Sequence, residues 1–215
     1  MAMPNGSAES SLTFERGLAL LQAIADVDGE PPTISELAER IGVSRAAVYR
    51  LLGPLQARGL VRRDGSRVRL GLGVLQLAGR VLPQLRLAAT PVLRALAEQV
   101  GATAHLTVAD GDEAQAVAVV EPSWTDIHVA YRVGSRHPLR RGAAGKAILL
   151  RPDGGPQWAL TTGELQPGAY GVAAPVRGVP GLRASVGVVA LQPLDAAKIG
   201  PLVVASARSV AAALT

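Results

Sequence analysis

The sequence predicts a two-domain α+β protein, with a helical N-terminal half that closes in a β-hairpin and a C-terminal half built on an antiparallel sheet with flanking helices. Three observations lead to this class. Apolar residues recur at helical spacing in the first 60 residues. Arginine-rich, alternating segments then flank Asp64-Gly65, a strong hairpin signal. In the second half most apolar segments alternate as strands do, and an Ala-rich helix ends near Leu214.

Length and composition exclude several classes of protein. At 215 residues the chain can hold one large domain or two small ones, and its apolar share of 48 % allows a sizeable core. It has no cysteine, which excludes disulfides and thiolate metal sites and suits a reducing cytosol. No apolar run reaches the roughly 18 residues of a membrane span. Residues 1–10 have no signal-peptide pattern and are expected to be a disordered tail. We therefore expect a cytoplasmic protein.

The first two helices are predicted from their spacing and their ends. The first runs from about Leu12 to Val27 and is ended by Gly29 and the prolines that follow. Thr33 and Glu36 form a capping box at the start of the second. Its apolar face repeats at helical spacing, with Ile34, Leu37, Ala38 and Ile41. Gly42 follows as the left-handed residue that ends this helix.

A third helix begins at the cap residue Ser44 and repeats the same apolar spacing through Leu55. Pro54 lies inside it, where proline removes a hydrogen bond and clashes with the carbonyl group of Arg50. We therefore expect a kink at Gly53-Pro54, which leaves residues 44–50 regular.

Four positions at fixed spacing match a helix-turn-helix motif, in which the second helix enters the major groove of DNA: Ala38, Gly42, Val48 and Leu51. Arginine is the usual bidentate partner of guanine, and hydroxyl groups contact bases or phosphates. The residues expected to contact DNA here are Thr33, Ser44, Arg45, Ala46, Tyr49 and Arg50.

The hairpin after this motif is predicted to be a wing, with Arg63, Arg67 and Arg69 near phosphates. Between Arg40 and Arg80 the sequence has nine arginines and a single acid, although the net charge of the whole chain is only +5. An alternative interpretation is an ordinary three-helix domain with a solvated basic face. The combination of spacing, glycine, wing and charge favours DNA binding.

A further helix is predicted over residues 71–87, interrupted by Pro83, and Pro91 is expected to start another that runs to Val100. We place the domain boundary near residues 78–88. Beyond it, the alternation predicts strands at residues 103–109, 114–121, 127–133, 172–176 and 184–191, and a short helix over residues 143–150.

Several segments form a specific pattern through their order and spacing. They are residues 14–21, the helix pair, and residues 49–52, 59–61, 101–106, 132–134, 142–147 and 172–176. In these segments the chain resembles the IclR family of transcriptional regulators. The resemblance implies a winged helix-turn-helix domain at residues 11–71, a linker helix at 72–87 and a GAF-like effector-binding and oligomerisation domain at 88–215. It also implies dimers paired through the DNA-binding domains, often assembled as tetramers.

The sequence departs from the pattern of this family in two places. The family normally has two more helices between its Gly-Lys-Ala helix and its Ala-Ala-Pro-Val strand, whereas here about 25 residues cover the gap. The effector domain is therefore expected to be shortened. In addition, Tyr170 stands in a neighbourhood where many members have a cysteine.

A small carboxylate is the expected effector, because backbone N–H groups at the start of the helix at Ala143 favour an anion and several arginines precede it. The resemblance likewise implies small organic or aromatic acids. Candidate effector-binding residues are Arg140, Ala143, Ala144, Gly145, Trp158, Tyr170 and Val172, with His105 and His128 possible on the sheet. Alternatively, the arginines are surface residues and the Gly-Ala run only allows tight packing.

The sequence contains no catalytic or metal-binding pattern. Three histidines, at 105, 128 and 137, have no ligand spacing between them, and no nucleophile elbow surrounds any serine. We expect no metal, no cofactor and no enzymatic activity.

The expected function is effector-dependent regulation of transcription by a homodimer or homotetramer on a palindromic operator, with no membrane partner. Two alternatives stay open. In one, the shortened C-terminal domain only assembles oligomers and binds no effector. In the other, which is less favoured, the protein is an enzyme that acts on a small acid.

Overall fold

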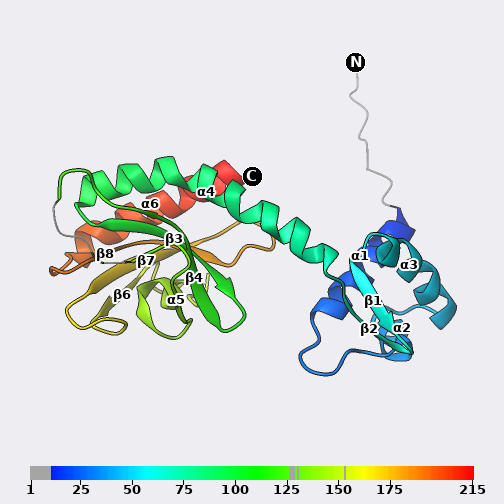
Figure 1. Cartoon of the computed structure of the whole chain (residues 1–215). Helices are drawn as coiled ribbons and strands as arrows, with labels where there is room; N and C mark the ends of the chain where they lie inside the picture. The colour runs from blue at the N-terminus through cyan, green and yellow to red at the C-terminus, as the bar shows by residue number, and fades with distance from the viewer. Residues whose placement is uncertain (1–10, 126–128, 130, 153) are drawn as a thin grey trace, which may run out of the picture. The chain divides into compact units, whose positions relative to one another are not determined.

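The structure, a computed structural model, describes residues 11–125, 129, 131–152 and 154–215. The chain divides into two compact units between Arg80 and Val81 (Figure 1). The expected tail at residues 1–10 and His128 lie outside the described residues. The N-terminal unit holds helices and a hairpin, and the C-terminal unit holds a larger sheet with helices, so the predicted α+β class is confirmed.

The N-terminal unit packs three helices against a two-stranded hairpin. Its elements are α1 (Leu12–Ala25), α2 (Ile34–Arg40), α3 (Arg45–Ala57), β1 (Val61–Asp64) and β2 (Arg67–Leu70). One apolar cluster joins all five, and it contains Leu20, Ile24, Ile34, Leu37, Ala38, Val48, Leu52, Val61 and Val68. The helical spacing read from the sequence therefore describes the faces that meet in this core.

The first helix ends at Ala25, two residues before the predicted end, whereas the predicted caps of α2 and α3 and the turn at Gly42 are confirmed. The Thr33 backbone N–H donates to the Glu36 carboxylate at 2.7 Å, and the Thr33 hydroxyl accepts from the Glu36 N–H at 3.3 Å. Gly42 has a φ of 65°, which lets the chain turn tightly into the next helix. The Ser44 hydroxyl accepts from the Ala47 N–H at 3.2 Å. The helix α3 continues through Pro54, and the expected kink there stays a prediction.

The long helix α4 (Gly73–Val100) corrects the expectation that Pro83 interrupts it and that Pro91 starts another helix. Each proline removes one backbone hydrogen bond. The buried face nevertheless continues past both, with Leu85, Ala89, Leu93, Leu96 and Ala97. Because each fully buried leucine contributes roughly 1.5–3 kcal/mol, this burial outweighs the missing bonds.

The C-terminal unit is built on an antiparallel sheet in the order β5-β4-β3-β8-β7-β6. The strands are β3 (Thr103–Asp110), β4 (Glu113–Val120), β5 (Arg136–Pro138), β6 (Ala159–Thr162), β7 (Tyr170–Val176) and β8 (Ala184–Ala190). The helices α4 and α6 (Ala196–Leu214) cover one face, and the short helix α5 (Gly142–Ile148) lies on the other (Figure 1).

The helix α6 is long and apolar enough to cross a membrane by length and mean hydropathy, 1.3, and it alone meets this test among the described residues. In this structure it instead packs against the sheet through Val203, Ala207 and Val210, which are all buried. Its apolar character therefore serves the core of the C-terminal unit.

The strand expected at residues 127–133 is not found in the described part of that segment. Val129, Tyr131, Arg132 and Val133 lie outside any strand. The free edge of β4 is taken instead by β5, through the register Ala114↔His137. The alternation that suggested a strand has another cause, because the side chains of Val129 and Tyr131 line a cavity. The edge strands β5 and β6 were not predicted from the sequence.

Candidate functional site

The outer face of α3 carries the side chains expected to contact DNA. Ser44, Arg45, Ala46, Tyr49 and Arg50 are exposed. On the opposite side of the same helix, the side chains of Val48 and Leu52 are buried in the core. The helix therefore presents a polar, basic surface to solvent while its apolar face fixes it to α1 and α2.

Several arginines of the N-terminal unit stay available for an external partner. Arg45, Arg50 and Arg62 are exposed and form no ion pair with any residue that the structure describes. The Arg63 guanidinium lies over the Tyr49 ring, 5.5 Å from its centre, a cation–π contact between the hairpin and α3.

The other residues expected at DNA are engaged within the unit. The Arg67 guanidinium donates to the Pro31 carbonyl oxygen at 2.7 Å and pairs with the Glu30 carboxylate at 2.8 Å. Arg69 pairs with Asp64 at 3.0 Å. The Thr33 hydroxyl is used in the cap of α2. These contacts hold the hairpin and the loop before α2 together, and they leave Arg67 and Arg69 partly neutralised.

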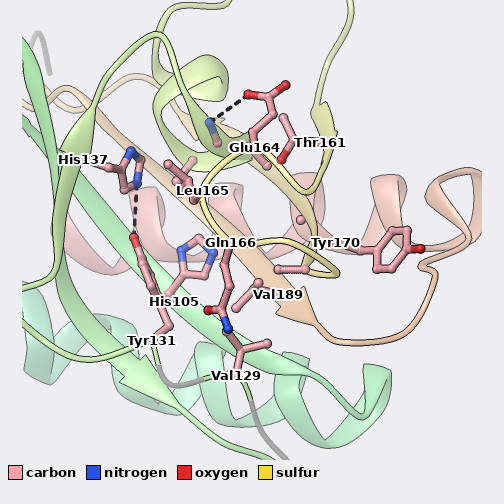
Figure 2. Close-up of a pocket in the computed structure, with 15 residues that line it drawn as sticks. His105, Val129, Tyr131, His137, Thr161, Glu164, Leu165, Gln166, Tyr170 and Val189 are labelled. Carbon is pink, nitrogen blue, oxygen red and sulfur yellow. Dashed lines mark hydrogen bonds between the residues drawn. The ribbon is translucent and has the colours of Figure 1, made fainter.

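A cavity of about 90 Å³ lies in the C-terminal unit, between the sheet and the elements on its α5 side (Figure 2). Its lining comes from β3, Val129 and Tyr131, β5, the start of α5, the strands β6 to β8 and the loop that joins β6 to β7. The polar lining residues are His105, Tyr131, His137, Thr161, Glu164, Gln166 and Tyr170. Among the described lining residues there is no lysine or arginine.

Strand register explains why His105 faces this cavity. Its neighbours in sequence, Ala104 and Leu106, point into the main core, so His105 points to the opposite face. On β8 the residue paired with His105 is Gly187. A Cβ atom on Gly187 would lie 2.9 Å from the His105 ring, so only glycine leaves room for it. Gly171 plays the same part beside Ala143 of α5, where a Cβ would lie at 3.1 Å.

A short polar network fixes the two histidines and the tyrosine. The Nδ1 atom of His137 lies 3.2 Å from the Pro138 carbonyl oxygen, which can only accept, so this nitrogen carries the proton. In the neutral ring Nε2 then accepts from the Tyr131 hydroxyl at 3.4 Å (Figure 2). The Tyr131 ring meets the His105 ring edge-on at 5.0 Å.

Burial controls the protonation of this network. Burial and the neighbouring His137 lower the pKa of His105 to about 3, so its ring is neutral at ordinary pH. Its Nδ1 atom lies 3.2 Å from the Thr107 hydroxyl. Burial also raises the pKa of the Tyr131 phenol, which therefore stays a hydrogen-bond donor. His105 and Tyr131 thus offer uncharged polar groups to the cavity.

Among the described lining residues the charged group is Glu164, in the loop between β6 and β7. Its carboxylate accepts from the Gly142 N–H at 3.1 Å and from the Lys146 ammonium group, both on α5 (Figure 2 shows the first of these). The bond from Lys146 lowers the pKa of Glu164, so the carboxylate is ionised near neutral pH. Arg141 also donates to the Glu164 carbonyl oxygen.

The predicted effector-binding residues are only partly brought together. Ala143, Ala144 and Tyr170 line the cavity, and Figure 2 shows that the Tyr170 ring points away from it. Of the two histidines named for the sheet, His105 lines it.

Four predicted effector-binding residues lie elsewhere. Arg140 is exposed, and Gly145 packs against the backbone of Leu139. Val172 is buried in the main core, and Trp158 packs on Gly200 of α6.

Sequence reasoning missed Tyr131, His137, Thr161, Glu164 and Gln166 as lining residues. Only the strand alternation around His105 held a usable signal, because the other side chains reach the cavity from irregular segments or edge strands. The segment that joins α5 to β7 contains β6 and turns, and none of its described residues is helical. This agrees with the expected shortening of the C-terminal domain.

Comparisons with known proteins match both units. The family model of the IclR helix-turn-helix domain matches residues 13–65, and that of the bacterial transcriptional regulator IclR C-terminal matches residues 82–154. The transcriptional repressor IclR of Escherichia coli is 30 % identical over 144 residues, which cover 65 % of this chain and 52 % of the relative. The acetate operon repressor of Salmonella typhimurium is 32 % identical over 142 residues, with coverage of 64 % and 52 %. The chain thus spans about half the length of the curated relatives it matches.

Solved structures share the fold over nearly the whole chain. An IclR-family protein from Rhodococcus sp. aligns over 100 % of both chains with a TM-score of 0.58 and 20 % identity. An IclR homolog from Microbacterium hydrocarbonoxydans, solved with 4-hydroxybenzoate, aligns over 94 % of this chain and 98 % of that one, with a TM-score of 0.51 and 19 % identity. With family models matching in both units and the fold shared, the chain belongs to the IclR family.

Proposed function

We propose that this protein is a DNA-binding transcriptional regulator whose affinity for a palindromic operator changes when a small organic acid binds in the C-terminal cavity. The observation that carries the DNA half is the exposed face of α3, where Arg45 and Arg50 have no ion-pair partner among the described residues. Arginine side chains so placed suit the edges of guanine in the major groove. The matched relatives, which are named as repressors, support this function over an enzyme that acts on a small acid.

A palindromic operator requires two copies of α3, so the proposal includes a homodimer, with a tetramer as its further assembly. In a dimer the two helices would lie about 34 Å apart, in successive major grooves. Support comes from exposed apolar side chains on α1, because Phe14 is 66 % and Leu18 is 51 % exposed. These residues border a groove of about 690 Å³ between α1 and α3. If this face joins the copies, Phe14→Glu will lower the mass measured by sedimentation, and an unchanged mass would exclude it.

The effector half rests on the cavity at His105, Tyr131 and Glu164. A cavity of about 150 Å³ holds one benzene molecule. The volume here is about 90 Å³, so only a smaller acid fits while the loop at Glu164 stays in place. The neighbour that contains 4-hydroxybenzoate supports an acidic ligand. The small volume also favours the alternative in which this domain only assembles oligomers. Because the partner is DNA and the relatives are bacterial, we propose a cytoplasmic location.

The DNA half is tested by selecting binding sites for the full chain from a randomised duplex pool. We expect enrichment of a palindrome, with affinity that falls steeply between about 50 and 200 mM salt. Arg45→Ala and Arg50→Ala should relax sequence preference, whereas Arg183→Ala, an exposed arginine of the C-terminal unit, should not. A pool without enrichment, or binding that ignores salt, would reject the proposal.

The effector half is tested by adding small carboxylates to the complex with the selected DNA. A change in DNA affinity with at least one of them is the expected result. If none changes DNA affinity or the melting temperature, the oligomerisation alternative is correct instead.

A further inference from the structure

The loop formed by residues 163–169 makes one wall of the cavity. Glu164, Leu165 and Gln166 from this loop line it (Figure 2), as does Ala169. Inside the loop, the Gly163 N–H donates to the Ala169 carbonyl oxygen at 2.8 Å, and the Ala169 N–H donates to the Gln166 carbonyl oxygen at 3.1 Å. These bonds close the loop where it leaves the paired strands β6 and β7.

Contacts to α5 hold this loop against the cavity, and Glu164 makes most of them. Its carboxylate binds the Gly142 N–H and the Lys146 ammonium, and its carbonyl oxygen accepts from Arg141. The side chain of Leu165 packs directly on Gly142, where an added Cβ would lie 2.5 Å from it. The side chains of Glu164 and Lys146 are 31 % and 41 % exposed, so their ion pair is partly shielded from water.

The charges around the cavity leave an acidic ligand few cations to pair with, so the Glu164–Lys146 ion pair affects whether it can bind. No lysine or arginine is among the described lining residues, and the buried His105 is neutral. Arg136 is held by Asp110 and Glu113, and Arg140 is exposed outside the lining. Lys146, one turn along α5 from the lining residues, is paired with the lining carboxylate of Glu164, and Arg141 donates to the carbonyl oxygen of the same residue.

We propose that Glu164 is a tethered carboxylate that competes with the acidic effector for Lys146, so that binding of the effector displaces Glu164 and releases the loop of residues 163–169. This inference rests on the proposed function, because it assumes that the cavity binds an acid. Replacing one carboxylate by another leaves Lys146 paired, which avoids an uncompensated charge near the protein interior. An uncharged ligand offers no such replacement, so it would not displace Glu164.

Displacement of Glu164 would also enlarge the cavity. With Glu164 in place the volume is about 90 Å³, less than an aromatic acid needs. Moving Glu164 and Leu165 away from Gly142 removes two lining side chains at once. Effector size and movement of the loop are therefore coupled in this proposal.

The test compares matched acids and amides on three forms of the full chain. The forms are wild type, Glu164→Gln, which keeps the shape but removes the charge, and Glu113→Gln as a control. Glu113 pairs with Arg136 on the same sheet and does not line the cavity. The probes are propionate with propionamide and 4-hydroxybenzoate with 4-hydroxybenzamide, and binding is measured by calorimetry.

We expect Glu164→Gln to bind the acids about tenfold more tightly than wild type. This is the factor that applies if Glu164 leaves Lys146 about one-tenth of the time in the wild-type protein. The amides should change less than about twofold, and Glu113→Gln should match wild type. Hydrogen exchange of residues 163–169 should rise in wild type when saturating acid is added. If Glu164→Gln folds poorly, Glu164→Asp takes its place, because its shorter side chain competes less well for Lys146. This variant should also bind the acids more tightly than wild type does, with little change for the amides.

Equal acid affinities in wild type and Glu164→Gln would overturn the competition while leaving the effector proposal standing. If neither acid binds any of the three forms, both the competition and the effector half of the proposed function are rejected.

Discussion

The guanidinium of Arg67 in the hairpin lies 2.8 Å from the carboxylate of Glu30, in the loop before α2. It also donates to the Pro31 carbonyl oxygen at 2.7 Å. Two backbone bonds run alongside, from Ile34 N–H to the Ser66 carbonyl oxygen and from Val68 N–H to the Pro32 carbonyl oxygen, both at 2.9 Å. The wing is thus fastened to the start of the helix-turn-helix motif, and Arg67 is part of the fastening.

This arrangement predicts different outcomes for two arginines of the same hairpin. Arg62→Ala should lower the salt slope of DNA binding by about one and leave stability within about 0.5 kcal/mol, because Arg62 has no described ion-pair partner. Arg67→Ala should lower the free energy of unfolding of the N-terminal unit by about 1 kcal/mol through its lost hydrogen bond. Chemical denaturation and salt titrations measure both, and equal stability of the two variants would contradict the fastening role.

The cap of α2 gives a second prediction. Thr33→Ala removes the hydroxyl that accepts from the Glu36 N–H, and should cost about 1 kcal/mol of stability, as cap losses usually do. Thr33→Ser keeps the hydroxyl and serves as the control. If both variants unfold at the same denaturant concentration as wild type, the capping box contributes nothing measurable.

The buried His105 predicts how stability depends on pH. Its pKa is about 3 in the folded protein, against 6.5 in the unfolded chain, so unfolding takes up a proton between these values. The stability of the C-terminal unit should therefore fall as pH drops from 6.5 toward 3, with a slope of at most about 1.4 kcal/mol per pH unit from this group. His105→Gln should flatten the curve of unfolding free energy against pH in this window. An unchanged curve would mean that His105 is not held neutral by the fold.

Close packing at Gly187 gives a fourth prediction. A Cβ there would lie 2.7 Å from the Ala173 Cβ and 2.9 Å from the His105 ring, so Gly187→Ala should destabilise the C-terminal unit by about 1–3 kcal/mol. Gly79→Ala is the matched control, because a Cβ on this helical glycine meets nothing within 4 Å. It should stabilise α4 by up to about 1 kcal/mol. Thermal melting distinguishes the two, and similar effects of both would refute the packing argument.

Prediction from sequence succeeded where the cause of a structure is local. The Thr33–Glu36 box, the left-handed Gly42 and the Asp64-Gly65 hairpin each depend on residues within four positions of one another. It failed at Pro83, because the burial of the following leucines on a distant sheet outweighs one lost hydrogen bond. It also failed for residues 127–133, where the described residues form no strand and the side chains of Val129 and Tyr131 line a cavity.

The sequence by itself therefore determined the helix-turn-helix elements, the charge that faces solvent on α3 and the class of the fold, since these follow from spacing, caps and turns. The tertiary structure alone decided which arginines are free and what surrounds the cavity. Arg67 meets Glu30 and Pro31 across 36 residues or more, and Glu164 meets Lys146 across 18. Such ion pairs depend on which segments pack side by side, and periodicity along one segment carries no information about a partner on another.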